Sequence, residues 1–231
     1  MRKVLMVVLA CFSLQGVALE RKELSAVSIN EITADTQAQF EGAGDSHVAF
    51  SWWVPYEYWK SVLTRDPNIT QAMKKQMLSV LIDYSVIAVV QADISPLGAF
   101  NFYSREEMTK SMRVTYTAAG AEEVILKPDL NVDQEMQLLM AQFGPILKAA
   151  MGQMGANFHF YIYRDVDGKG KRLLDPYATG NLEVTVKTRE GIPLNASFDT
   201  PLNSLFVPRV CPNGELAHVS WNYCPWSGKK L

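Results

Sequence analysis

Tyr84-Ser-Val-Ile-Ala-Val-Val90 is an uncharged, β-branched segment near the middle of a 231-residue chain. β-Branched side chains favour extended backbone, and an apolar run without alternation is typical of a strand that is covered on both faces. We therefore expect this segment to be the central strand of a sheet.

Two amphipathic helices are predicted before this strand. Pro55 suits the first turn of a helix, and the apolar residues after it recur at helical spacing: Tyr56, Trp59, Val62 and Leu63. Residues 65–70 end this helix and cap a second one, which has an apolar stripe: Met73, Met77, Val80, Leu81 and Tyr84. Upstream of both helices, a short strand is expected near Ala26–Thr33, with a loop after it.

The remaining elements alternate between strands and helices. Ser104 to Glu107 reads as a capping box for a short helix, and Gly144-Pro145 should kink or split a long helix over 132–154. Further strands are expected over 99–103, 113–117, 122–127, 157–164, 181–187 and 194–198. This order predicts an α+β fold with a mainly antiparallel sheet and packed helices, with one domain over residues 19–205. A small C-terminal tail over 206–231 should pack on or beside it.

The N-terminus has the pattern of a secretory signal peptide. Arg2 and Lys3 precede an apolar block over 4–14, and small residues lead to a cleavage site after Ala18. We therefore expect an exported protein, periplasmic or extracellular, with no transmembrane segment, because no later apolar run reaches about 20 residues. A lipoprotein anchored through Cys11 is the alternative interpretation.

Composition excludes one class of partner. Removal of residues 1–18 leaves 20 basic and 24 acidic side chains, so the mature chain has no basic excess that would attract nucleic acid. Hydrophobic residues make up 48% of the chain, which is enough for a sizeable core. The expected partner is an unknown protein or a small molecule.

The last 21 residues contain the two cysteines that remain after cleavage at Ala18. In an oxidising compartment, a disulfide between Cys211 and Cys224 is the first expectation. The segments Cys211-Pro-Asn-Gly214 and Cys224-Pro-Trp-Ser-Gly228 resemble half of a zinc ribbon, in which each Cys-Pro knuckle has lost its second cysteine. The resemblance leaves a metal site as an alternative, with Cys211, Cys224 and His218 as candidate ligands, but structural zinc takes four.

Five aromatic residues lie close together around the start of the first predicted helix: Trp52, Trp53, Tyr56, Tyr58 and Trp59. So many large rings cannot all face one way on a short helix, so Trp52, Trp53, Tyr56 and Trp59 are a candidate binding surface. The alternative is that this segment covers the core.

No catalytic residue is assigned. The histidines, His47, His159 and His218, are scattered, and the neighbours Asp45-Ser46-His47 cannot face one another as a triad does. Asp165-Val-Asp-Gly-Lys-Gly170 resembles the start of a calcium loop, but Lys169 opposes a cation, and a hairpin turn is the better interpretation. The sequence favours a binding or assembly module without a cofactor; an exported hydrolase or a metal-handling protein are the alternatives.

Overall fold

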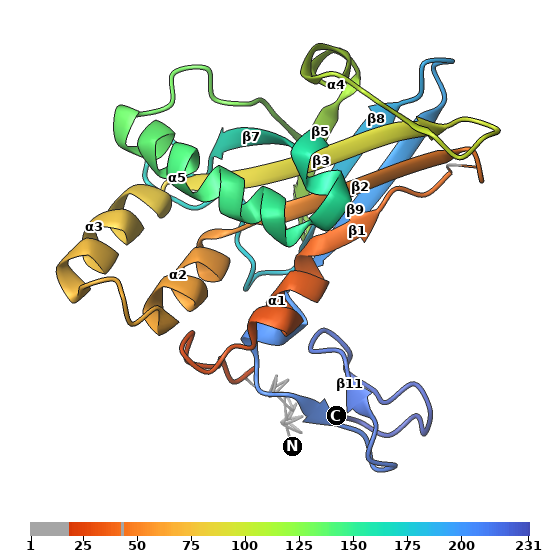
Figure 1. Ribbon diagram of the computed structural model, residues 1–231. Helices are drawn as coiled ribbons and strands as arrows, with labels where there is room; N and C mark the ends of the chain where they lie inside the picture. Colours follow the sequence, from red (N-terminus) through yellow and green to blue (C-terminus); the bar gives the residue numbers. More distant parts are fainter. Residues whose placement is uncertain (1–18, 43) are drawn as a thin grey trace, which may run out of the picture.

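The computed structural model describes residues 19–42 and 44–231; the expected signal peptide and Cys11 lie outside this range. The protein has an α+β fold with mostly antiparallel sheets, as expected (Figure 1). The helices are α1 (Ile29–Thr36), α2 (Tyr56–Arg65), α3 (Gln71–Leu81), α4 (Arg105–Ser111) and α5 (Gln134–Ala150). The strands are β1 (Gln37–Gln39), β2 (His47–Val54), β3 (Tyr84–Ile94), β4 (Phe100–Phe102), β5 (Arg113–Ala118), β6 (Val124–Leu126), β7 (His159–Arg164), β8 (Gly180–Lys187), β9 (Pro193–Thr200), β10 (Arg209–Val210) and β11 (Leu216–Ala217).

Strand β3 is the centre of the larger sheet, as its sequence predicts. It pairs antiparallel with β2 along one edge, and with β7 and then β4 along the other. Its side chains are buried from Tyr84 to Ala92, which requires cover on both faces. The expectation of a doubly covered central strand is confirmed.

Two neighbouring residues of β2 identify the layers that pack on the two faces of the larger sheet. The Trp52 ring meets Tyr58 of α2 at a centroid distance of 5.3 Å, whereas the Trp53 ring meets Phe198 of β9 at 6.4 Å. Successive side chains of a strand point to opposite faces. Helices α1, α2 and α5 therefore lie on one face of this sheet, and the second sheet covers the other (Figure 1).

The second sheet has the strand order β6-β5-β8-β9, all antiparallel. In β9 buried and exposed residues alternate strictly from Pro193 to Thr200, and β8 alternates in the same sense. Such alternation is typical of an antiparallel sheet with one face on the core and the other toward water. The second sheet is therefore an outer layer.

Local capping signals place the starts of α3 and α4 correctly. Thr70 caps α3, and Ser104 with Glu107 forms the complete capping box of α4. Pro145 lies inside α5 without splitting it, and the helix ends at Ala150, followed by a 3-10 turn over Gly152–Asn157.

One expectation for the N-terminal region is wrong. The segment expected as a strand near Ala26–Thr33 contains helix α1, because Ser28 caps it and only the i, i+4 pair Ile32 and Thr36 is buried along it. The aromatic segment also begins as a strand, β2, before Pro55 starts α2.

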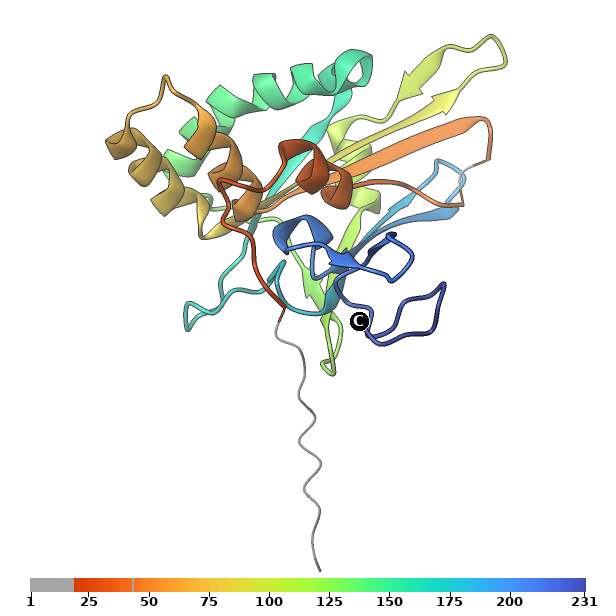
Figure 2. The same ribbon diagram turned by 90° about the horizontal axis from the view of Figure 1, so that it is seen from below.

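The C-terminal tail has its own small buried cluster, formed by Cys211, Ala217 and Cys224. It lies at one margin of the molecule, apart from α3 and α5 (Figure 2). Asn203 anchors it, because its side-chain oxygen accepts a hydrogen bond from the Val219 amide at 2.9 Å. Among the described residues, none of the helices combines the length and the apolar character that crossing a bilayer would require.

Candidate functional site

The aromatic segment before and within α2 is part of the core. Trp52, Trp53 and Trp59 are at most 2% exposed, Tyr58 is buried, and only Tyr56 is half-buried. Their rings pack edge-on against one another and against other layers, and Trp59 meets Phe143 of α5 at 5.3 Å. The expected binding surface on Trp52, Trp53 and Trp59 is therefore wrong. The alternative, that this segment covers the core, is correct.

The expected Cys211–Cys224 disulfide is present. Each cysteine also starts a tight turn: the Gly214 amide donates to Cys211 O and the Gly228 amide to Cys224 O, both at 2.8 Å. Both glycines have positive φ, a conformation that other residues rarely adopt. The disulfide and the two turns fix the backbone of the tail.

The tail residues do not fit a metal ion. Both sulfurs are consumed by the disulfide, so neither can act as a thiolate ligand. His218 is hydrogen-bonded through Nδ1 to Ser220 Oγ at 2.7 Å. Across the part of the chain that the structure describes, no three His, Cys, Asp or Glu side chains are grouped so as to hold a metal.

The tail exposes a set of apolar side chains. We call this set the tail surface; its members are Val210 (56% exposed), Leu216 (63%), Trp221 (40%), Tyr223 (61%) and Trp226 (55%). The Trp221 and Trp226 rings meet edge-on at 6.1 Å. Residues Val210 and Leu216 are direct cross-strand partners in the β10-β11 hairpin.

Arg209 holds the tail surface in place. Its Nη1 donates to the carbonyl oxygens of Val219 at 3.2 Å and Trp221 at 2.6 Å. A charged donor binds a carbonyl more strongly than a neutral one. The exposed Trp221 ring is thus carried by a backbone that is tied at both the disulfide and the arginine.

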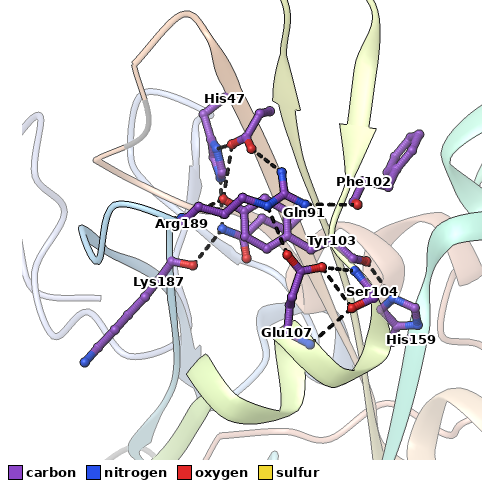
Figure 3. A network of polar contacts seen from close by, with 10 residues as sticks. His47, Gln91, Phe102, Tyr103, Ser104, Glu107, His159, Lys187 and Arg189 are labelled. Atoms are coloured by element: carbon purple, nitrogen blue, oxygen red, sulfur yellow. Dashed lines mark hydrogen bonds and ion pairs between the residues drawn. The ribbon is translucent and has the colours of Figure 1, made fainter.

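A second candidate site is a polar cluster at the ends of β2 and β3 (Figure 3). His47 Nδ1 lies 2.8 Å from Asp93 Oδ1, and Arg189 contacts the other oxygen of Asp93. Arg189 Nε also donates to Glu107 Oε1 at 3.0 Å, and the Arg189 guanidinium stacks over the Tyr103 ring at 4.0 Å. A cavity of about 320 Å³ adjoins His47 and Asp93.

The pKa values in this cluster reflect fixed pairing. Partial burial raises the pKa of Asp93, but hydrogen bonds from His47, Arg189 and Tyr103 outweigh it and leave the pKa below its ordinary value. The Ser104 backbone and then Arg189 lower the pKa of Glu107 to about 2. Desolvation raises the pKa of the Tyr103 phenol to about 12. At neutral pH these carboxylates stay ionised and the phenol stays protonated.

His47 is not free to act as a base. The Gln91 side-chain nitrogen donates to His47 Nε2 at 3.1 Å and to Lys187 O at 3.1 Å, so the nitrogen and not the oxygen of Gln91 faces the ring. His47 Nε2 is therefore an acceptor and Nδ1 donates to Asp93. Both ring nitrogens are committed to structural contacts.

The cluster pairs His47 with a residue that sequence reasoning did not consider. Asp93 and Arg189 lie 46 and 142 residues further along the chain, and only the pairing of β2 with β3 places His47 opposite Asp93. The side-chain hydrogen-bond partners of His47 are Asp93 and Gln91, and not its sequence neighbours Asp45 and Ser46. His159 is separate and bonds to the Tyr103 carbonyl oxygen at 3.0 Å.

Comparison with known proteins gives no family for this chain. No family model, curated protein or solved structure matches it. Its function therefore has to be inferred from its own side chains.

A third polar group is buried between the layers. Arg172 forms a two-pronged ion pair with Glu57, at 2.5 and 2.9 Å, and its Nε donates to Asp165 at 3.1 Å. Asp165 belongs to the loop that resembles a calcium site, and its carboxylate also accepts from the Leu174 amide at 2.6 Å. The segment turns the chain as expected, with Val166 bridged to Arg172. This cluster joins α2 to the segment after β7.

Proposed function

We propose that this is an exported, non-enzymatic binding module that docks a protein partner through the tail surface. The single observation that carries the proposal is the exposure of Trp221, Tyr223 and Trp226 on a backbone fixed by a disulfide. The tryptophans of β2 and α2 are buried in the core. In contrast, Trp221, Tyr223 and Trp226 are exposed to solvent.

The chemistry of the tail surface favours a protein partner. Trp, Tyr and Arg are the residues most enriched in the energetic centres of protein interfaces. Rings on a rigid backbone also lose little conformational freedom on binding. The tail also exposes the aliphatic pair Val210 and Leu216, and protein interfaces combine aromatic and aliphatic side chains.

Export is supported by the N-terminal sequence pattern and by the disulfide, because disulfides persist mainly in oxidising compartments. A hydrolase centred on His47 is disfavoured by the two committed ring nitrogens. A general base needs a nitrogen that can accept a proton from a nucleophile or water.

The proposal is tested by site-specific photocrosslinking in the cells that produce the protein. A benzophenone amino acid at exposed Asn222, within the tail surface, should give one discrete protein adduct. The same amino acid at exposed Lys75 on α3 is the matched control and should not give that adduct. In the Trp221→Ser/Trp226→Ser background the adduct at position 222 should disappear.

Because both tryptophans are exposed, this double substitution should leave the fold intact, which the melting temperature checks. No adduct at position 222, or an adduct that persists without the two tryptophans, would contradict the proposal.

A further inference from the structure

A groove of about 510 Å³ runs along the outer edge of β7. Helix α4 borders it on one side, and the segment 127–132 borders it on the other. Phe160 and Ile162 of β7 are half-buried and lie on one face of the strand, since side chains alternate. Leu130, 92% exposed, and Val132 add apolar surface. A concave apolar site of this volume suits a small organic ligand.

The edge of β7 is closed to an added strand. The Asp129 amide donates to Ile162 O at 2.8 Å, and the Arg105 guanidinium donates to Phe160 O through Nη1 at 3.1 Å and Nη2 at 2.5 Å. A peptide that extends a sheet needs these outward carbonyl groups to be free. A ligand in this groove would therefore contact the side chains that line the groove and not the backbone edge of β7.

The groove carries positive charge that has no carboxylate partner. Among the ion pairs of residues 19–42 and 44–231, neither Arg105 nor Lys127 takes part in one. Asp129 is the acidic residue among those that line the groove, and Arg164 neutralises it at 3.2 Å. The groove thus combines two available cations with an apolar wall.

Arg105 is held ready for an anion. Its guanidinium stacks over the Tyr161 ring at 4.9 Å while it bonds to Phe160 O. A guanidinium has five N–H donors, so donors remain for a carboxylate after this contact. Stacking and the backbone bond reduce the freedom that the side chain would lose on binding.

We propose that this groove binds a free fatty acid, with the carboxylate against Arg105 and Lys127 and the alkyl chain along Phe160, Ile162 and Leu130. The two cations match the head group, and the apolar wall matches the chain. The ligand would also remove Leu130 from water, which is favourable in proportion to the apolar area covered. This site is separate from the tail surface.

Calorimetric titration of the full mature protein with decanoate tests the proposal, with 1-decanol as the uncharged analogue. Decanoate should bind saturably, and more weakly as salt is raised. Arg105→Gln and Lys127→Gln should each weaken binding roughly tenfold or more, since each removes a charged contact. Lys110→Gln is the matched control on α4, because Lys110 is exposed and pairs with Glu106 at 2.7 Å, and binding should not change.

Leu130→Ser tests the apolar wall at a residue so exposed that its replacement should not affect folding, and it should also weaken decanoate binding. The proposal is overturned if decanoate does not bind saturably, or if 1-decanol binds equally well. It is likewise overturned if the Arg105, Lys127 and Leu130 variants all bind as the unmodified protein does. None of these outcomes bears on photocrosslinking from the tail.

Discussion

Replacing Asp165 with asparagine should remove most of the loss of stability that the protein suffers as pH rises from about 4 to 6. The Asp165 side chain is fully buried. It shares the guanidinium of Arg172 with Glu57, which takes both of the terminal nitrogens. One cation therefore serves two buried carboxylates, and burial raises the pKa of Asp165 to about 6 in spite of Arg172.

The linkage between proton binding and folding gives the sign and size of this pH-dependent change in stability. An aspartate has a pKa of about 3.9 in an unfolded chain. Between about pH 4 and pH 6 the folded protein holds the Asp165 proton more tightly than the unfolded chain does, so folding stability falls as pH rises. A difference of about two pKa units corresponds to roughly 3 kcal/mol, fully lost once pH exceeds the folded pKa. Asparagine cannot ionise, so the variant lacks this loss.

Urea denaturation of the protein and of Asp165→Asn from pH 4 to pH 7 measures the effect. The free energy of unfolding of the variant, relative to the unmodified protein, should increase by roughly 2 kcal/mol across this range, because part of the total is already lost at pH 4. Other acids such as Asp93 and Glu107 are common to both proteins, so their contributions cancel. Glu57→Gln, which leaves Arg172 to Asp165 alone, should reduce the pH dependence. A difference that stays constant from pH 4 to pH 7 would refute the reasoning.

Two other predictions concern the core and the tail. Trp53→Phe should destabilise the protein by about 1 kcal/mol more than Trp52→Phe in urea denaturation, because the Trp53 indole donates to Ser85 Oγ at 3.2 Å. The Trp52 indole nitrogen, although buried, has no partner among the described residues; equal losses would count against this difference. Replacing Cys211 and Cys224 by serine should remove about 3 kcal/mol of chain-entropy stabilisation from the tail. Hydrogen exchange should therefore speed up in 206–231 but not in β3, and faster exchange in β3 would show that the tail supports the core.

Local signals in the sequence predicted the central strand and the starts of α3 and α4. In each case a few neighbouring residues decide the outcome: the β-branched run of β3, the Thr70 cap, and the reciprocal bonds of Ser104 and Glu107. Helix α1 was missed because its stabilising cap, Ser28, lies inside a stretch whose sparse apolar residues fit either period.

The candidate sites depended on tertiary placement, which the sequence does not reveal. Trp52 and Trp53 look like a surface cluster until two different layers cover the two faces of β2. Trp221 and Trp226 flank Cys224 in the sequence, yet the buried cluster of the tail is formed by Cys211, Ala217 and Cys224, and both rings are exposed. Similarly, nothing local connects His47 to Asp93, because their contact arises from the register of two strands.

Iodide quenching of tryptophan fluorescence tests most directly the claim that the accessible aromatic surface is in the tail. Iodide reaches only exposed rings, and of the five tryptophans only Trp221 and Trp226, at 40% and 55%, are exposed. If the accessible aromatic surface is in the tail, Trp221→Phe/Trp226→Phe should remove nearly all of the quenching. Quenching that persists in this variant at the level of the unmodified protein would show that Trp52, Trp53 or Trp59 is accessible, and would contradict the assignment of the binding surface to the tail.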